Sequence, residues 1–93
     1  MPIQKRWSKL PKVKNAPAKA GVYELGNVKK NIVKIGEGKK LKERLDQQMP
    51  SIPKDVKYVR WLQTKAHGKL EKQMLEQFKK EHGRLPKYNE RIG

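Results

Sequence analysis

The sequence predicts an α+β domain in which a small three-stranded sheet, antiparallel or mixed, is flanked by helices in the order β-β-α-β-α. Two short runs rich in β-branched and aromatic residues are separated only by turn formers, and a third such run follows later. Two other segments carry apolar residues at helical spacing. A chain of 93 residues, 34% of them hydrophobic, forms one domain with a thin core. A sheet covered by helices is a layout that buries such a core.

The three strands are expected at Gly21–Leu25, Ile32–Gly36 and Asp55–Gln63. The first two form a hairpin, because Gly26–Asn31 carries turn-forming residues at both of its ends. So short a connection cannot make a parallel crossover, so these two strands are expected to be antiparallel.

Two amphipathic helices are expected. The first covers Lys40–Met49 and is stopped by Pro50 and Pro53. Its apolar stripe consists of Leu41, Leu45 and Met49. The second runs from about Lys65 to His82 and ends where Gly83 can adopt a left-handed C-cap. Its apolar stripe consists of Leu70, Met74, Leu75 and Phe78.

Residues 1–20 are expected to form a basic, extended arm that precedes the domain of residues 21–93. Three prolines in this segment argue against a regular helix or a central strand. Trp7 either packs the arm against the domain or stacks on a nucleic-acid base, and packing is favoured. The arm and the domain together contain no internal repeat and no low-complexity block.

The charge of the chain is its most informative global property. Twenty-four Lys and Arg against nine Asp and Glu give a net charge of +15, which attracts polyanions. Nucleic acid, held by salt-sensitive phosphate contacts, is the favoured partner. An anionic membrane surface, a ribosome-associated role and simple solubility are the alternatives. No apolar run approaches the roughly 18 residues of a membrane span, and the absence of cysteine fits a reducing, cytoplasmic or nucleoid-associated location.

The segment "IGEGKK" contains two glycines at the start of a basic stretch. Their spacing fits neither the nucleotide P-loop nor the dinucleotide fingerprint, and Glu37 would repel a phosphate. A structural role, in which Gly36 and Gly38 let the chain turn from strand into helix, is therefore expected.

Several side chains are candidates for chemistry. Arg44 borders an apolar helical stripe, where it could hold a phosphate or simply be exposed. Glu71 borders the stripe of the second helix and could bind a divalent metal or pair with Lys or Arg. His67 lies four residues before Glu71 on the same face, which is a weak metal signal. Tyr23, taken alone, is a core or half-buried tyrosine.

Together these residues resemble the motifs of the GIY-YIG nuclease superfamily. "GVY" at 21–23 matches the first motif, and "KIG" at 34–36 stands where Tyr-Ile-Gly is expected. Arg44 follows eight residues after Gly36, Glu71 lies on the later helix, and Asn89 comes near the end. The resemblance extends from Gly21 to Asn89 and implies a GIY-YIG-like fold.

The resemblance also implies a mechanism. Glu71 would bind one divalent ion, Mg²⁺ or Mn²⁺, that polarises the scissile phosphate, and Arg44 would stabilise the charge of the transition state. Tyr23 would position or deprotonate the attacking water, and Lys34, in place of the second tyrosine, would hold the phosphate. Gly36 and Asn89 would support the site, Asn89 by hydrogen bonds to the metal-site carboxylate or to the phosphate.

Two functions follow from the resemblance, and Lys34 separates them. The favoured one is a metal-dependent DNA endonuclease, directed by DNA structure or by a protein partner. The alternative is a GIY-YIG-fold module that binds nucleic acid and has lost cleavage, because a charged lysine cannot act as a base near neutral pH. In either case the basic residues around the first helix are expected to contact nucleic acid, namely Lys39, Lys40, Lys42 and Arg44. A ribosome-associated protein of unrelated fold is the third interpretation.

Overall fold

The computed structural model describes residues 3 and 5–89. They form a four-stranded antiparallel sheet with the strand order β1-β4-β2-β3, so the predicted α+β fold is confirmed and the sheet has one strand more than expected. The strands are β1 (Ser8–Lys9), β2 (Gly21–Asn27), β3 (Ile32–Gly38) and β4 (Val56–Gln63). The helices are η1 (Leu10–Asn15), α1 (Leu41–Gln48), η2 (Met49–Ser51) and α2 (His67–His82).

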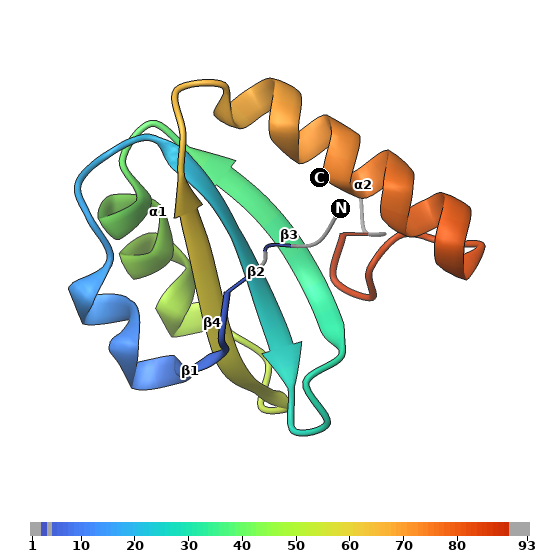
Figure 1. Cartoon of the computed structure of the whole chain (residues 1–93). Helices are drawn as coiled ribbons and strands as arrows, with labels where there is room; N and C mark the ends of the chain where they lie inside the picture. The colour runs from blue at the N-terminus through green and yellow to red at the C-terminus, as the bar shows by residue number, and fades with distance from the viewer. Residues whose placement is uncertain (1–2, 4, 90–93) are drawn as a thin grey trace.

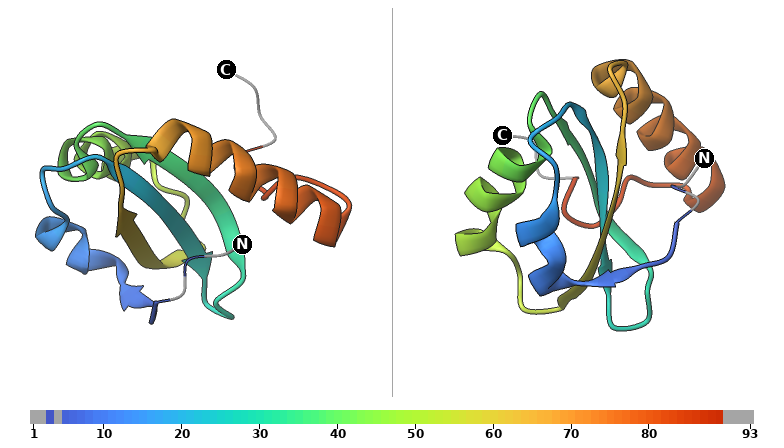
Figure 2. Two further views of the ribbon diagram at one scale, coloured as in Figure 1. Left: turned by 45° about the horizontal axis from the view of Figure 1, so that its top comes forward. Right: turned by 60° about the vertical axis from the view of Figure 1, so that its left-hand side comes forward.

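The elements are arranged in three layers. Figure 1 shows the sheet between α1 and α2, and Figure 2 shows η1 and α1 on one face of it with α2 on the other. We call these the α1 face and the α2 face. Because successive strand residues point to opposite faces, β2 supplies Tyr23 and Leu25 to the core of the α1 face and Val22 to that of the α2 face.

The segment before Gly21 differs locally from the expected extended arm. Ser8 and Lys9 pair with β4 as an edge strand, and the following residues form the 3₁₀ helix η1, with Pro11 in its first turn. Proline is tolerated there because the first N–H groups of a helix have no intrahelical partner. Val13 and Ala16 are buried in the core of the α1 face, so these residues complete that core. The division of the chain at residue 20 stays a prediction.

Trp7 packs against the sheet, in agreement with the favoured interpretation. A Cβ atom added to Gly26 would lie 2.9–3.2 Å from three atoms of the Trp7 ring, so the indole occupies the space above this glycine. The guanidinium of Arg60 lies 4.1 Å from the centroid of the same ring.

The third predicted strand is present as β4, but one residue points differently from the alternation that the sequence predicts. Strict alternation puts Val56 on the same face as Tyr58 and Leu62. The register instead shifts between Gly26 and Asn27 of β2, and Val56 joins Val59 in the core of the α1 face. An extra residue in one strand of a pair reverses the alternation beyond it.

Among the described residues, no helix is long and apolar enough to cross a membrane. α2 ends as predicted, with Gly83 at φ 76° in the left-handed conformation and its N–H bonded to the carbonyl of Lys79.

Candidate active site at the outer edge of the sheet

The candidate site lies at the end of β3, where β3 leads into α1 and where α2 begins on the other side of the sheet (Figure 1). Tyr23 is directly opposite Gly36 in the β2–β3 ladder. A Cβ at Gly36 would overlap atoms Cζ and Oη of Tyr23, and a Cβ at Gly38 would lie 3.0 Å from Cβ of Arg44. The absence of a side chain at Gly36 and Gly38 therefore lets the Tyr23 ring and the aliphatic part of Arg44 pack directly against the backbone of β3.

This close approach corrects the expected reason for the glycines. Both lie inside β3, and among the described glycines only Gly83 has a positive φ, so no turn conformation is required at 36 or 38. The phosphate-loop alternative also fails, because the first amides of α1 are already occupied. Leu41 N donates to the carbonyl of Lys19 at 2.9 Å, and Lys42 N donates to that of Pro17 at 3.0 Å.

Tyr23 is fully buried, and its hydroxyl has no hydrogen-bond partner of normal geometry in the described part of the chain. Burial raises the pKa of this hydroxyl to about 12. Arg44 and Gln48 lie close enough to lower that pKa, whereas the charge of Glu71 raises it. Tyr23 is therefore a neutral phenol at physiological pH.

Glu71 lies in the second turn of α2 and is half-buried. Burial raises its pKa, and the negative charge of Glu37 raises it further. Arg44, Lys34 and His67 act in the opposite direction. The charge of Glu71 thus acts on the pKa of Tyr23, and the charges of Lys34 and Arg44 act on the pKa of Glu71, although these three residues come from other elements of the fold.

His67, which gave only a weak metal signal together with Glu71, has a partner on another element. Its Nδ1 atom contacts the carboxylate of Glu37 on β3. This contact joins the first turn of α2 to the end of β3, and it gives Glu37 a partner at the edge of the site.

Lys34 and Arg44 share a hollow of about 480 Å³ on the α1 face. Lys34 is opposite Leu25 in the β2–β3 ladder and is partly buried. The hollow is lined by Leu25, Lys34, Arg44, Gln48, Ser51, Ile52, Pro53 and Tyr88. Two cationic side chains and one aromatic ring therefore face the same space, next to the candidate site.

The three lysines expected to contact nucleic acid are exposed around the start of α1. Lys40 lies 3.9 Å from Glu43, and Lys42 lies 3.8 Å from Asp46. Lys39 and Arg44 line a shallow hollow of about 300 Å³ together with Lys40. These side chains form a basic rim at the start of α1.

The Asn89 side chain makes two hydrogen bonds with the outer edge of β3. Its Oδ1 accepts the N–H of Ile35 at 2.7 Å, and its Nδ2 donates to the carbonyl of Ile35 at 2.8 Å. Tyr88 N also donates to the carbonyl of Val33 at 2.8 Å. The described contacts of Asn89 thus hold the backbone of the motif strand at Ile35, and its expected support of the metal-site carboxylate or of the phosphate stays a prediction.

Tyr88 and Gln48 were not identified from the sequence. Tyr88 lies in an irregular tail without periodicity, and Gln48 is a polar residue near a helix end. The position of Tyr88 next to the motif residue Asn89 is the one signal that could have drawn attention to it.

The residues at this edge suit a divalent ion bound mainly by water. No group of three or more His, Cys, Asp or Glu side chains among the described residues could hold a metal. Mg²⁺ does not require such a group, since it keeps several waters and commonly takes one or two carboxylates. The like-charge effect of Glu37 on the pKa of Glu71 is what a cation at Glu71 would relieve, so Glu71 fits a one-carboxylate site.

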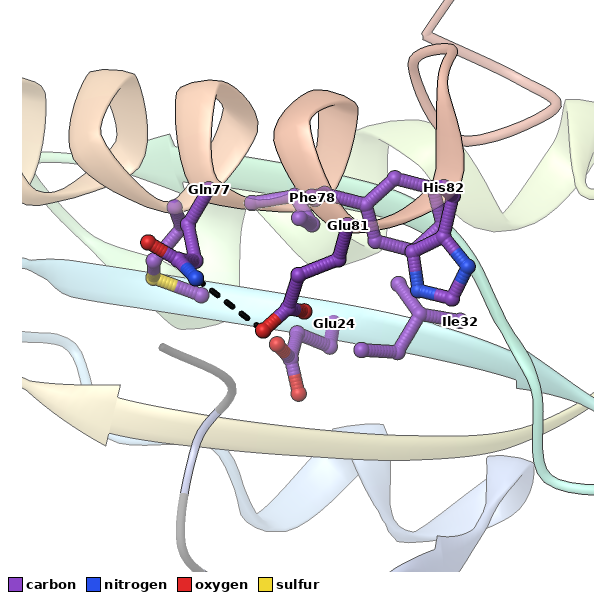
Figure 3. A pocket seen from close by; sticks show the side chains of 8 residues that line it. Glu24, Ile32, Gln77, Phe78, Glu81 and His82 are labelled. Atoms are coloured by element: carbon purple, nitrogen blue, oxygen red, sulfur yellow. Dashed lines mark hydrogen bonds between the residues drawn. The ribbon is translucent and has the colours of Figure 1, made fainter.

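A second, smaller hollow lies under the C-terminal half of α2. Its volume is about 80 Å³, and Figure 3 shows Glu24, Gln77 and Glu81 around it, with Gln77 bonded to Glu81 at 3.0 Å. It is lined by Glu24, Ile32, Ile35, Met74, Gln77, Phe78, Glu81 and His82. This hollow is too small for a nucleotide and contains neither Arg44 nor Glu71, so it is separate from the candidate site.

The fold is similar to that of a known nuclease domain. The crystal structure of the GIY-YIG N-terminal endonuclease domain of UvrC from Thermotoga maritima, a point mutant bound to its catalytic divalent cation, superposes with a TM-score of 0.62. The match covers 84% of this chain and 90% of that chain at 21% sequence identity, and at this identity it establishes the fold alone. No curated protein matches the chain. A family model matches residues 1–82, and the chain therefore belongs to the family described as "Domain of unknown function (DUF7508)", with a GIY-YIG-like fold.

Proposed function

We propose that this protein is a metal-dependent DNA endonuclease that hydrolyses phosphodiester bonds at the outer edge of its sheet. One observation carries the proposal: Tyr23, Arg44 and Glu71 influence one another electrostatically at this edge, with Lys34 also acting on Glu71. The fold is similar to that of an endonuclease domain, and the net charge of +15 favours a polyanionic substrate.

Arg44 and Lys34 hold the scissile phosphate. A guanidinium can donate two parallel hydrogen bonds to phosphate oxygens, and an ammonium adds a compact positive charge. Both groups line the hollow next to Tyr23. Positive charge fixed at this position stabilises the extra negative charge of the pentavalent transition state.

Tyr23 orients the attacking water. Its buried oxygen, which lacks a partner of normal geometry within the described residues, accepts a hydrogen bond from that water. The water oxygen forms the new bond to phosphorus while the bond from phosphorus to the leaving oxygen breaks, and the leaving oxygen takes a proton from solvent. The released proton passes to solvent, since a hydroxyl with a pKa of about 12 is already protonated at neutral pH.

Glu71 supplies the carboxylate for a divalent ion, Mg²⁺ or Mn²⁺. Such an ion, when bound, polarises the phosphate and stabilises the leaving oxygen. Glu37 and His67 hold the start of α2 against β3, which keeps Glu71 at the edge. Asn89 keeps the β3 backbone in place at Ile35.

The second candidate function is a nucleic-acid-binding module without cleavage. Lys34 favours it, because a lysine replaces the second tyrosine of the motif. Under this alternative, Arg44 and Lys34 bind phosphates in a salt-sensitive manner, and Glu71 has no catalytic role.

The test compares plasmid, branched and single-stranded DNA incubated with Mg²⁺ or Mn²⁺. We expect wild type to cleave at least one substrate, and Glu71→Ala to lose at least about 100-fold in rate. Glu76→Ala is the matched control, because Glu76 is an exposed glutamate on the same helix, and its rate should equal that of wild type.

The possible results separate the two functions. Equal cleavage by wild type and Glu71→Ala would point to a contaminant or a wrong site. Absence of cleavage with salt-sensitive binding retained would favour the binding module. A gain of cleavage in Lys34→Tyr, from an inactive wild type, would show that this substitution had disabled the enzyme.

A further inference from the structure

We propose that the hollow on the α1 face binds one unstacked nucleotide of a DNA strand, with its phosphate at Lys34 and Arg44 and its base against the ring of Tyr88. The proposal rests on the proposed function for its chemistry and adds the substrate class, namely DNA that is single-stranded, flapped or mispaired at the site. The hollow of about 480 Å³ lies within the range of about 300–1,000 Å³ found for small-molecule sites.

The lining of the hollow combines two kinds of side chain. Lys34 and Arg44 are cationic, which suits a phosphate. Leu25, Ile52 and Pro53 are apolar and line the same space as Tyr88, which suits the faces of a base. Gln48 and Ser51 also line the hollow, and the Gln48 amide carries both a donor and an acceptor for a base edge. A lining that is both cationic and apolar matches a nucleotide better than a bare phosphate.

Tyr88 is held at its hydroxyl and at its backbone, and Nζ of Lys87 lies 5.1 Å from the centroid of its ring. Its hydroxyl donates to Oδ1 of Asp55 at 2.6 Å, a bond that lowers the pKa of the Asp55 carboxyl. Its backbone amide donates to Val33, and the adjacent Asn89 is bonded to Ile35. A ring that is already ordered loses little conformational entropy on binding. Stacking of a base on such a ring contributes about 1–3 kcal/mol.

The burial of the lining favours a base that is unstacked. Leu25 is buried in the core of the α1 face, and Tyr88 and Ile52 are half-buried against the same core, so part of the lining belongs to that core. A base within a duplex is stacked on both of its faces and cannot enter such a space. A base that is already unpaired costs least to extrude, which favours single-stranded and mispaired DNA.

The test measures binding without metal, so that it does not depend on cleavage. Glu71→Ala protein in EDTA is titrated with a short oligothymidine that contains one fluorescent adenine analogue. We expect the fluorescence of the analogue to be quenched when the protein binds the single strand. When the same sequence is in a duplex, adding the protein should not change this fluorescence. Adding Tyr88→Leu should weaken single-strand binding about tenfold, as the loss of one base stack predicts, whereas Tyr88→Phe retains the ring and should bind within about threefold of the parent.

A second measurement needs no substitution at Tyr88 and so is independent of its effect on folding. An abasic sugar–phosphate strand of the same length carries the same charge but no bases, and it should bind about tenfold more weakly than oligothymidine at equal ionic strength. Equal affinities for the two strands, or equal quenching by duplex and single strand, would overturn the proposal. Displacement of the strand by a free deoxynucleoside monophosphate at micromolar concentration would also overturn it, because a free nucleotide would then be the ligand.

The outcomes distinguish a failure of this proposal from a failure of the proposed function. Base-dependent binding together with a lack of cleavage in Mg²⁺ would support the nucleotide hollow and contradict the nuclease. Cleavage of intact duplex at equal rates in wild type and Tyr88→Leu would support the nuclease and contradict the nucleotide hollow.

Discussion

On the α2 face of the sheet, the buried carboxylate of Glu24 lies 2.6 Å from Nε of Arg60 and accepts the backbone amide of Ile3 at 3.3 Å. On the α1 face, the equally buried hydroxyl of Tyr23 has no partner of normal geometry among residues 3 and 5–89. The two groups belong to neighbouring residues of the same strand, so they share a backbone and differ in what surrounds their side chains.

The difference separates a structural polar group from one that is held for a ligand. Burial raises the pKa of Glu24, and Arg60 acts against that shift. Arg60 also donates to the carbonyl of Lys5 and stacks on Trp7. The Glu24 carboxylate and the Arg60 guanidinium therefore both have partners within the protein. Arg44 and Gln48 lie near the Tyr23 hydroxyl and lower its pKa, but neither makes a hydrogen bond of normal geometry with it, and incompletely satisfied buried groups of this kind are concentrated at functional sites.

The largest effect on stability is expected from Glu24→Ala. Arg60, whose side chain is only 14% exposed, would lose its partner, and the free energy of unfolding should fall by about 3 kcal/mol. Urea denaturation measures the change. Glu43→Ala is the control, because Glu43 pairs with Lys40 at an exposed position and should cost less than about 1 kcal/mol. Equal losses in the two variants would mean that the Glu24 pair is no more important than a surface pair.

An intermediate effect is expected from Gly36→Ala. The added methyl group would overlap the Tyr23 ring, and the resulting overpacking should cost about 2 kcal/mol. Gly68→Ala is the matched control, since no atom lies within 4 Å of a Cβ there, and alanine in a helix should stabilise by up to about 1 kcal/mol. If Gly36→Ala were neutral, Tyr23 would not be fixed over the strand as described.

A small effect on stability is expected from Tyr23→Phe. The variant loses a hydroxyl that makes no normal hydrogen bond within the described chain, so the free energy of unfolding at pH 7 should change by less than about 1 kcal/mol. Cleavage should nevertheless fall if Tyr23 orients the water. A large loss of stability would indicate that the hydroxyl has an important structural partner.

The pH dependence of Tyr23 has a definite sign. Its pKa in the folded protein is about 12, against 10.0 for an ordinary tyrosine. The unfolded chain therefore ionises first, and stability present below pH 10 is lost as the pH rises from about 10 to 12. Tyr23→Phe should lack this part of the alkaline loss, which denaturation at several alkaline pH values would measure. An identical alkaline loss in both proteins would contradict the raised pKa.

The parts of this molecule that the sequence predicts are those with a local signal. Hairpin β2–β3, helix α1 and the C-cap at Gly83 follow from turn formers, apolar spacing and one glycine. Strand β1 has two residues and exists only because β4 pairs with it, so no local pattern marks it. The register shift that turns Val56 toward the α1 face is likewise a property of the strand pair.

In the candidate site, too, some residues have a local sequence signal and others do not. Tyr23, Arg44 and Glu71 could be located because their spacing resembles known motifs. Tyr88 reaches the hollow through the tertiary bonds to Asp55 and Val33, and sequence distance hides those contacts. The contact between His67 and Glu37 joins two residues 30 positions apart in the sequence, so nothing local in the sequence indicates it.

The central claim is that the outer edge of the sheet binds a cation and a phosphate. Thermal unfolding of wild type and Glu71→Gln at pH 7.5, with and without Mg²⁺, tests it most directly. Burial and Glu37 raise the pKa of Glu71 from 4.5. Its protonated form is therefore favoured in the fold, and that stability is lost as the pH rises from 4.5 through the raised pKa. A neutral glutamine avoids this loss, so Glu71→Gln should melt above wild type without metal.

Added Mg²⁺ should stabilise wild type, by about 1.4 kcal/mol at ten times its dissociation constant, and should leave Glu71→Gln unchanged. Glu76→Gln, altered at an exposed position on the same helix, should respond to Mg²⁺ as wild type does. The account would be contradicted if Mg²⁺ raised the melting temperature of wild type and Glu71→Gln equally, or if Glu71→Gln melted below wild type without metal.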